Sequence, residues 1–144
     1  VQEAGFKYHM NDFNATVGLH NLEDVDAIIS AHQENGFYYD KALKGVPGIR
    51  LLKRFKQRVS SYWLYTILVH DRTKFMERML EQGITTSQVH SRNDLMTMFK
   101  QYYVDLPGVN QFTAHQVNIP VGWWVTPETR GYIENTIKEI VNVN

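Results

Sequence analysis

Two short segments of the sequence carry side chains that could bind a charged ligand. The first contains Lys7 and His9, immediately before an apolar periodic pattern begins. A lysine ammonium is a point charge well suited to phosphate, whereas histidine is positively charged only near or below its unperturbed pKa of about 6.5 unless a nearby anion favours the cation. Lys7 is therefore the stronger anion ligand. The alternative is an exposed lysine and a half-buried histidine at the start of a helix.

The second segment is the polar loop HSRND at 90–94. The guanidinium of Arg92 could bind diphosphate or carboxylate oxygens through two parallel hydrogen bonds. The side chains of His90 and Asn93 could form hydrogen bonds with hydroxyl groups. The alternative is a solvated polar turn in which Arg92 pairs with Asp94, and the residue types leave both interpretations open.

Composition and motifs exclude several other kinds of chemistry. Fifteen basic side chains balance fifteen acidic ones, so no net field attracts nucleic acid or a membrane surface. The chain has no cysteine, its six histidines are scattered, and we find no zinc, phosphate-loop or serine-hydrolase motif. The basic run KRFKQR at 53–58 is typical of a solvated connection, and the aromatic pair Trp123–Trp124 is more typical of a core. No metal site is predicted.

The elements that must position these loops begin with a long helical segment. Asn11 is a good N-cap, and apolar residues recur at helical spacing from Phe13 to Leu43. Gly18 and Gly36 make one straight helix doubtful, so we expect a kink or two pieces. The GVPG turn at 45–48 ends the segment.

A small sheet with covering helices is predicted after this turn. Residues 49–52 form a short expected strand, and residues 60–70 form a stronger one whose two faces are both apolar, which favours a central position in the sheet. Asp71 should cap a helix that ends at Gly83. Further strands are expected at 84–89 and 117–119, with a short helix through 98–99 and a loop around 106–108.

The final helix has the clearest start signal. Thr126, Pro127 and Glu128 supply a hydroxyl cap, a proline at the first helical position and an acidic side chain near the positive end of the helix dipole. Its apolar residues recur at the spacing that buries one side against a sheet. The predicted fold is one α/β domain, 1–144, of the α+β-like kind: a long N-terminal helical segment and a small, mostly antiparallel sheet with helices packed on it.

The segment GFKYHMNDFNATVGLHNL at 5–22 resembles a motif of the DegT/DnrJ/EryC1/StrS family of sugar-nucleotide aminotransferases. The motif, G-x-N-x-R-M followed by a small-residue helix that ends in Gly-Leu and a polar-Leu pair, is matched by Gly5, Tyr8, Met10, Ala15, Gly18, Leu19 and Leu22. Lys7 and His9 depart from it. The segments SSYWLYTILV, EQGI and IPVGWWVT are similar to later parts of the same family, so the resemblance extends over nearly the whole chain.

The resemblance implies the fold of the C-terminal small domain of fold type I enzymes, which use pyridoxal 5'-phosphate. Lys7 and His9 take the positions of an Asn and an Arg that contact the cofactor phosphate of a neighbouring subunit. His90, Arg92 and Asn93 fall in the loop that lines the sugar-nucleotide side of the family pocket. The implied reaction transfers an amino group, with glutamate as the expected donor, to a keto-sugar nucleotide in a cytoplasmic homodimer.

The family places its Schiff-base lysine and the Asp that holds the pyridinium nitrogen upstream of this motif. The sequence starts at Val1, directly before a motif that normally lies well inside a longer protein. We therefore expect a C-terminal fragment that contains no catalytic residue, is inactive alone and does not retain the cofactor by itself. The alternative is a free-standing α/β binding or interaction module without catalysis.

Overall fold

The structure is a computed structural model that describes residues 8–142. Lys7 therefore lies outside the described residues. The helices and strands, in chain order, are α1 (Asp12–Glu23), α2 (Val25–Ala42), β1 (Ile49–Leu51), β2 (Tyr65–Val69), α3 (Arg72–Glu81), α4 (Pro107–His115), β3 (Gln116–Ile119) and α5 (Pro127–Asn142), with two 3₁₀ turns, η1 (Asn93–Leu95) and η2 (Thr97–Tyr102).

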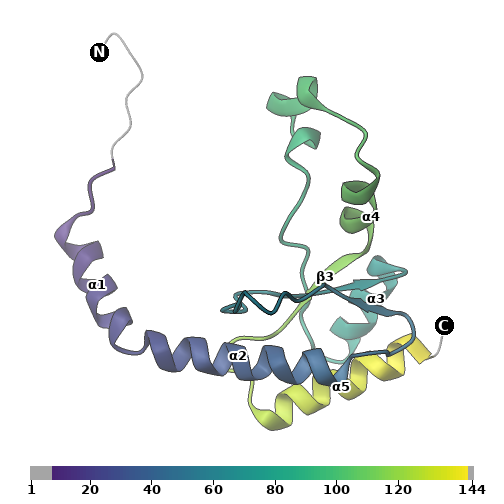
Figure 1. Ribbon diagram of the computed structural model, residues 1–144, viewed down its shortest axis with the longest axis horizontal. Coiled ribbons are helices and arrows are strands. Elements are labelled where there is room, and N and C mark those ends of the chain that lie inside the picture. The colour runs from purple at the N-terminus through teal and green to yellow at the C-terminus, as the bar shows by residue number, and fades with distance from the viewer. Residues whose placement is uncertain (1–7, 143–144) are drawn as a thin grey trace.

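The sheet has three antiparallel strands in the order β1-β2-β3. The central position of β2 agrees with the prediction from its two apolar faces. Helices α2 and α5 run beneath the sheet, and α4 with the two 3₁₀ turns rises on the opposite side (Figure 1). The predicted α/β domain with a long helical start and a small antiparallel sheet is confirmed.

The core fills the space between the sheet and the helices below it. The completely buried residues there are Tyr39 of α2, its C-cap residue Leu43, Tyr65 and Ile67 of β2, and Ile137 of α5. Their burial explains why the helical spacing in α2 and α5 and the strand spacing in β2 could be read from the sequence. Leu80 of α3 is 64% exposed, although Phe75 and Met79 of the same helix are buried.

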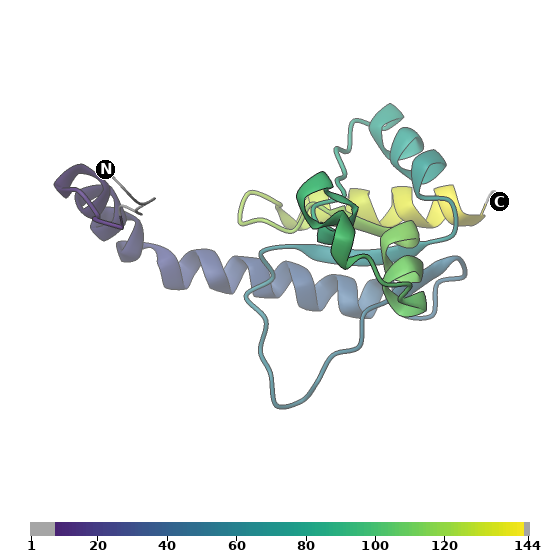
Figure 2. The same ribbon diagram turned by 90° about the horizontal axis from the view of Figure 1, so that it is seen from above.

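The helical start is divided into two pieces, as predicted, but neither glycine is the break. Asp24 lies between α1 and α2, where it serves as C-cap of one helix and N-cap of the next. Asn11 caps α1 as expected, because its Oδ1 accepts a hydrogen bond from the backbone N–H of Asn14 at 2.8 Å. Helix α1 projects away from the rest of the chain (Figures 1 and 2).

Two regions differ from their predicted secondary structure. Residues 84–89 contain one isolated bridge, Ser87 to Asn118, rather than a strand. The loop expected at 106–108 is the start of α4, where Pro107 occupies the first turn of the helix. Helix α4 was not predicted because its sequence, PGVNQFTAH, contains few strong helix-forming residues.

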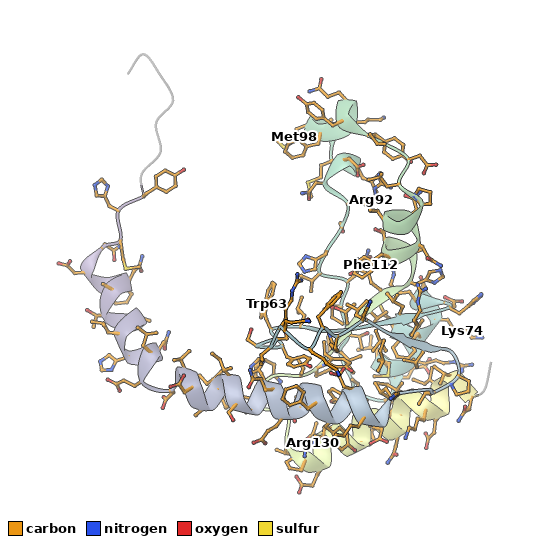
Figure 3. The ribbon with its side chains drawn as sticks, in the orientation of Figure 1. Trp63, Lys74, Arg92, Met98, Phe112 and Arg130 are labelled. Atoms are coloured by element: carbon orange, nitrogen blue, oxygen red, sulfur yellow. The ribbon has the colours of Figure 1, made fainter. Side chains whose placement is uncertain are left out.

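Large apolar side chains are exposed on two separate arms of the molecule. On α1, Phe13, Leu19 and Leu22 are 76%, 67% and 63% exposed. On the arm that carries the 3₁₀ turns, Leu95 and Met98 are also mostly exposed, and Met98 lies at its tip (Figure 3). Exposed apolar surface of this extent marks contact surfaces in soluble proteins. None of the helices within residues 8–142 has the length and apolar character needed to cross a membrane.

Candidate functional site

A groove of about 730 Å³ opens where α2, the start of β2 and the β3–α5 loop meet. Its walls include all three tryptophans of the chain, Trp63, Trp123 and Trp124, which are 70%, 60% and 61% exposed. We had expected the Trp123–Trp124 pair to belong to the core, and their exposure contradicts that interpretation. Aromatic rings at the mouth of a groove can stack on a ligand ring.

The backbone around Trp63 is fixed by α2. The ring nitrogen Nδ1 of His32 donates a hydrogen bond to the carbonyl of Tyr62 at 2.9 Å. Tyr62 has a φ of 50°, a left-handed conformation that is uncommon for a large side chain. Its ring packs directly against Gly36, where an added Cβ would lie 2.5 Å from the ring carbons. Tyr62 is therefore packed against α2 and buried, whereas the neighbouring Trp63 is exposed.

The loop that carries Trp123 and Trp124 is fixed by a buried amide. Asn35 of α2 is 3% exposed, and its Nδ2 donates to the carbonyls of Gly122 and Val125 at 3.1 and 3.0 Å. Its Oδ1 accepts a hydrogen bond from Nη1 of Arg130 on α5 at 3.1 Å. One side chain therefore links α2, the tryptophan loop and α5.

Ser87 and Asn118 contribute polar groups to the lining of the groove. Oγ1 of Thr66 donates to Oδ1 of Asn118 at 2.7 Å, and Nδ2 of Asn118 donates to the carbonyl of Ser87 at 3.2 Å. Ser87 and Asn118 also exchange both backbone hydrogen bonds. Ser87 and Asn118 thus add a hydroxyl and an amide to the aromatic lining of the groove, a combination suited to a ligand with both rings and hydroxyl groups.

His90 and Asn93 are both exposed, and His90 lies beside this groove. The ring of His90 meets the ring of Trp63 edge to face, with the ring centroids 6.2 Å apart. The buried side chain of Gln116 donates a hydrogen bond to the carbonyl of His90, which fixes the start of the loop. The structure thus brings His90 next to a groove residue that the sequence did not single out.

Arg92 has a different environment from its neighbours, because its side chain is buried. It donates to the carboxylate of Asp94, to Asn110 and to the carbonyl of Val104 at 2.8 Å. Its guanidinium also lies 4.9 Å from the ring centroid of Tyr103. The Arg92–Asp94 pairing that we considered as the alternative is present, and it ties the arm of residues 93–110 together (Figure 3).

His9 is exposed and precedes the N-cap of α1. The helix that follows it, α1, extends away from the sheet (Figure 1), and His9 is not among the lining residues of the groove. The structure therefore does not bring His9 together with His90 and Asn93 within one chain. Tyr8 and Met10 beside it are 87% and 73% exposed, so this segment has an accessible surface.

A second polar cluster lies on the other side of residues 60–64. The carboxylate of Asp40 accepts hydrogen bonds from Tyr65 at 2.7 Å and from Tyr62 at 2.8 Å, and it pairs with Arg54 at 3.1 Å. Burial alone would raise the pKa of Asp40, but the hydrogen bonds from Arg54 and the two tyrosines outweigh it and lower the pKa. Burial, reinforced by the hydrogen bond to Asp40, raises the pKa of Tyr62 to about 12.

Residues 1–138 match the DegT/DnrJ/EryC1/StrS aminotransferase family. The chain belongs to this family. Sugar aminotransferase CalS13 from Micromonospora echinospora is 38% identical over 94% of the chain, with a TM-score of 0.90. AtS13 from Actinomadura melliaura is 41% identical over 96% of the chain, with a TM-score of 0.89. GDP-perosamine synthase of Escherichia coli O157:H7 is 25% identical over 94% of the chain.

The chain spans 37% of the length of each of these three relatives. Aminotransferases of the DegT/DnrJ/EryC1/StrS family depend on pyridoxal 5'-phosphate. The groove has no lysine among its lining residues, so the described part of this family member offers no amine there for a Schiff base. No cluster of three or more metal-binding side chains occurs within residues 8–142.

Proposed function

We propose that this chain is the C-terminal domain of a longer pyridoxal-phosphate aminotransferase that transfers an amino group, with glutamate as donor, to a keto-sugar nucleotide. The observation that carries the proposal is the family match over residues 1–138. It is supported by the structural overlap of 94% of this chain with a sugar aminotransferase at 38% identity. The names of the relatives also support a sugar-nucleotide substrate.

The exposed apolar arms support a larger parent protein. The apolar side chains of α1 and of the 3₁₀ arm have no covering layer among the described residues. A catalytic large domain or a second subunit would bury such surface, which gains roughly 25 cal/mol for each Å² removed from water. In a homodimer, α1 could reach from one subunit toward the pocket of the other.

Lys7 and His9 are proposed to hold the cofactor phosphate of the partner subunit. When bound, the cofactor supplies the electron sink that stabilises negative charge on the substrate carbon. The contribution of this chain is to orient the phosphate by charge and hydrogen bonds. His9 is exposed and precedes the N-terminal end of α1, which leaves its ring available to another subunit.

His90, Arg92 and Asn93 are proposed to serve the substrate side of the pocket, in two different ways. His90, which lies beside Trp63, and Asn93 are both exposed, so their side chains are suited to direct hydrogen bonds with sugar hydroxyls. Arg92 already donates to three internal partners, so its contribution would be to hold the loop in shape.

The test is an amino-transfer assay of the parent protein that contains this chain. Purified parent is supplied with pyridoxal 5'-phosphate, glutamate and nucleotide-linked 4-keto and 3-keto sugars, and 2-oxoglutarate formation is measured. Glutamate-dependent amination of a keto-sugar nucleotide is the expected result. An open reading frame that encodes only a binding module without an upstream lysine-bearing domain, or a parent that binds these sugars without amination, would contradict the proposal.

A further inference from the structure

His70 and His115, which are 45 residues apart in the sequence, lie side by side in the structure. His70 directly follows the last residue of β2, and His115 is the last residue of α4. The centroids of their rings are 6.4 Å apart, and the ring planes are inclined to each other by 41°. The distance between the two residues along the chain explains why histidine spacing gave no sign of the pair.

The hydrogen bonds of His115 determine which of its ring nitrogens is free. Its Nδ1 lies 2.8 Å from the carbonyl oxygen of Val69 and 3.1 Å from that of His70. Because a carbonyl oxygen can only accept a hydrogen bond, Nδ1 carries the proton, and Nε2 of the neutral ring has a free lone pair. Histidines that bind metal ions usually donate their other ring N–H to a carboxylate or a backbone carbonyl in this way. His115 is therefore held in the tautomer that a metal ligand needs.

Both histidines line a pocket of about 310 Å³. Gln111 lines the same pocket one helical turn before His115, and its amide oxygen is a further potential ligand. Among the described residues that line the pocket, Arg50 alone has a permanent charge. Arg50 is exposed, so its long side chain can keep the guanidinium in solvent, away from an ion bound between the two rings.

The two rings are close enough to share one metal ion. Imidazole nitrogens bind zinc at about 2.1 Å, which places the centroids of two rings on one tetrahedral ion about 5 Å apart. The observed 6.4 Å exceeds this separation by roughly 1 Å. His70 is exposed, and its side chain forms no hydrogen bond within residues 8–142. Rotation of this free side chain can therefore bring its ring within reach of the ion.

We propose that His70 and His115 bind one divalent transition-metal ion, with Gln111 or water as further ligands. Imidazole nitrogen is a ligand that suits zinc, copper and nickel ions. The bound ion joins the end of β2 to the end of α4, and α4 follows the 3₁₀ turns in the chain. Binding therefore strengthens the attachment of the 3₁₀ arm to the sheet. The site does not depend on the proposed function, because none of its residues lines the tryptophan groove.

The test is isothermal titration of the metal-free 144-residue chain with Zn²⁺. H70A should weaken zinc binding by about tenfold or more, because it removes one of the two nitrogen ligands. H70A is a sharper variant than H115A, since His115 also holds the backbone at the end of β2. H20A, which removes an exposed histidine of α1 outside the pocket, is the matched control and should bind zinc like the wild type.

Two further measurements separate direct ligation from a structural effect of the substitution. Electron paramagnetic resonance of the Cu²⁺-loaded chain should show coupling to two imidazole nitrogens in the wild type and to one in H70A. Zinc should raise the Tm of the wild type more than that of H70A, because an ion that binds the folded state stabilises it.

Equal zinc affinity of the wild type and H70A would overturn the proposal, as would coupling of copper to a single imidazole in the wild type. An increase in Tm with inorganic phosphate but not with zinc would also overturn it. The pocket would then be an anion site formed by Arg50 and the two histidines.

Discussion

Oδ1 of Asn35 on α2 accepts a hydrogen bond from Nη1 of Arg130 on α5 at 3.1 Å. The amide nitrogen of Asn35 at the same time donates to two carbonyls of the loop that carries Trp123 and Trp124. A single buried side chain thus connects the helical layer beneath the sheet with the wall of the groove. The shape of the groove and the stability of the domain depend on the same contact.

Replacing Asn35 by alanine should therefore destabilise the domain. The change removes the hydrogen bonds that the Asn35 side chain makes with the carbonyls of the buried residues Gly122 and Val125 and with the guanidinium of Arg130. We expect the free energy of unfolding to fall by about 2–3 kcal/mol, the usual cost of unsatisfied buried polar groups. Urea unfolding measures this change. Q57A, in the exposed β1–β2 connection, is the control, and equal stability of the two variants would contradict the role given to Asn35.

Two helical glycines should respond in opposite directions to the same substitution. At Gly36 an added methyl group would lie 2.5 Å from the ring of Tyr62, so G36A should cost about 1–3 kcal/mol. At Gly18 nothing lies within 4 Å, so G18A should stabilise the protein by about 0.5–1 kcal/mol through better helix propensity. Thermal unfolding of both variants compares them directly. Similar shifts in Tm would show that Gly36 is not required for the packing of Tyr62.

Asp40 should make stability depend on pH in the acidic range. Its pKa is lowered in the folded protein, so its stabilising effect is complete above its unfolded pKa of about 3.9 and is lost as the pH falls through the folded value. At pH 7 we expect D40N to be less stable by about 1–2 kcal/mol, because hydrogen bonds to a charged acceptor are lost. The difference from the wild type should shrink between about pH 5 and pH 3. A constant difference across this range in urea unfolding would exclude the carboxylate charge as its cause.

The three residues of the 90–94 loop should separate into two classes. R92K removes the fork of hydrogen bonds to Asp94, Asn110 and Val104, so the arm of residues 93–110 should be cleaved faster by limited proteolysis. H90A and N93A remove exposed side chains and should leave proteolysis unchanged, while raising the KM of the parent for its nucleotide sugar by about tenfold. A rise in KM for R92K without faster cleavage would instead indicate direct substrate contact by Arg92.

Capping residues at helix starts and a glycine at a helix end made several helices predictable from the sequence. Asn11 and Asp71 cap helices as expected, Gly83 has the left-handed φ of 72° that ends α3, and Thr126 begins α5. Residues 60–64 were predicted as strand from their composition, but the anchoring of Tyr62 to α2 prevents it. Such contacts connect residues distant in the chain, so spacing could not predict them.

The candidate site shows the same division. The polar residue types at 90–94 marked a loop whose first residue, His90, lies beside the groove in the structure. The sequence did not predict the groove itself. Trp63 falls in the segment expected to form a strand, and the Trp123–Trp124 pair is typical of a core, so neither was recognised as a groove residue. The tryptophan loop is held at the surface by hydrogen bonds from Asn35, which is distant from this loop in the sequence.

The most direct test of the shared-pocket account is subunit complementation in the parent enzyme. One variant carries K7A/H9A and the other has its Schiff-base lysine replaced by alanine, and each alone should have little activity. In a hybrid dimer one of the two pockets combines an intact lysine with intact Lys7 and His9 from the partner. An equal mixture should recover about a quarter of the wild-type activity, because half of the dimers are hybrids with one complete site. Hybrid dimers without activity, or K7A/H9A with full activity and cofactor retention, would contradict the account.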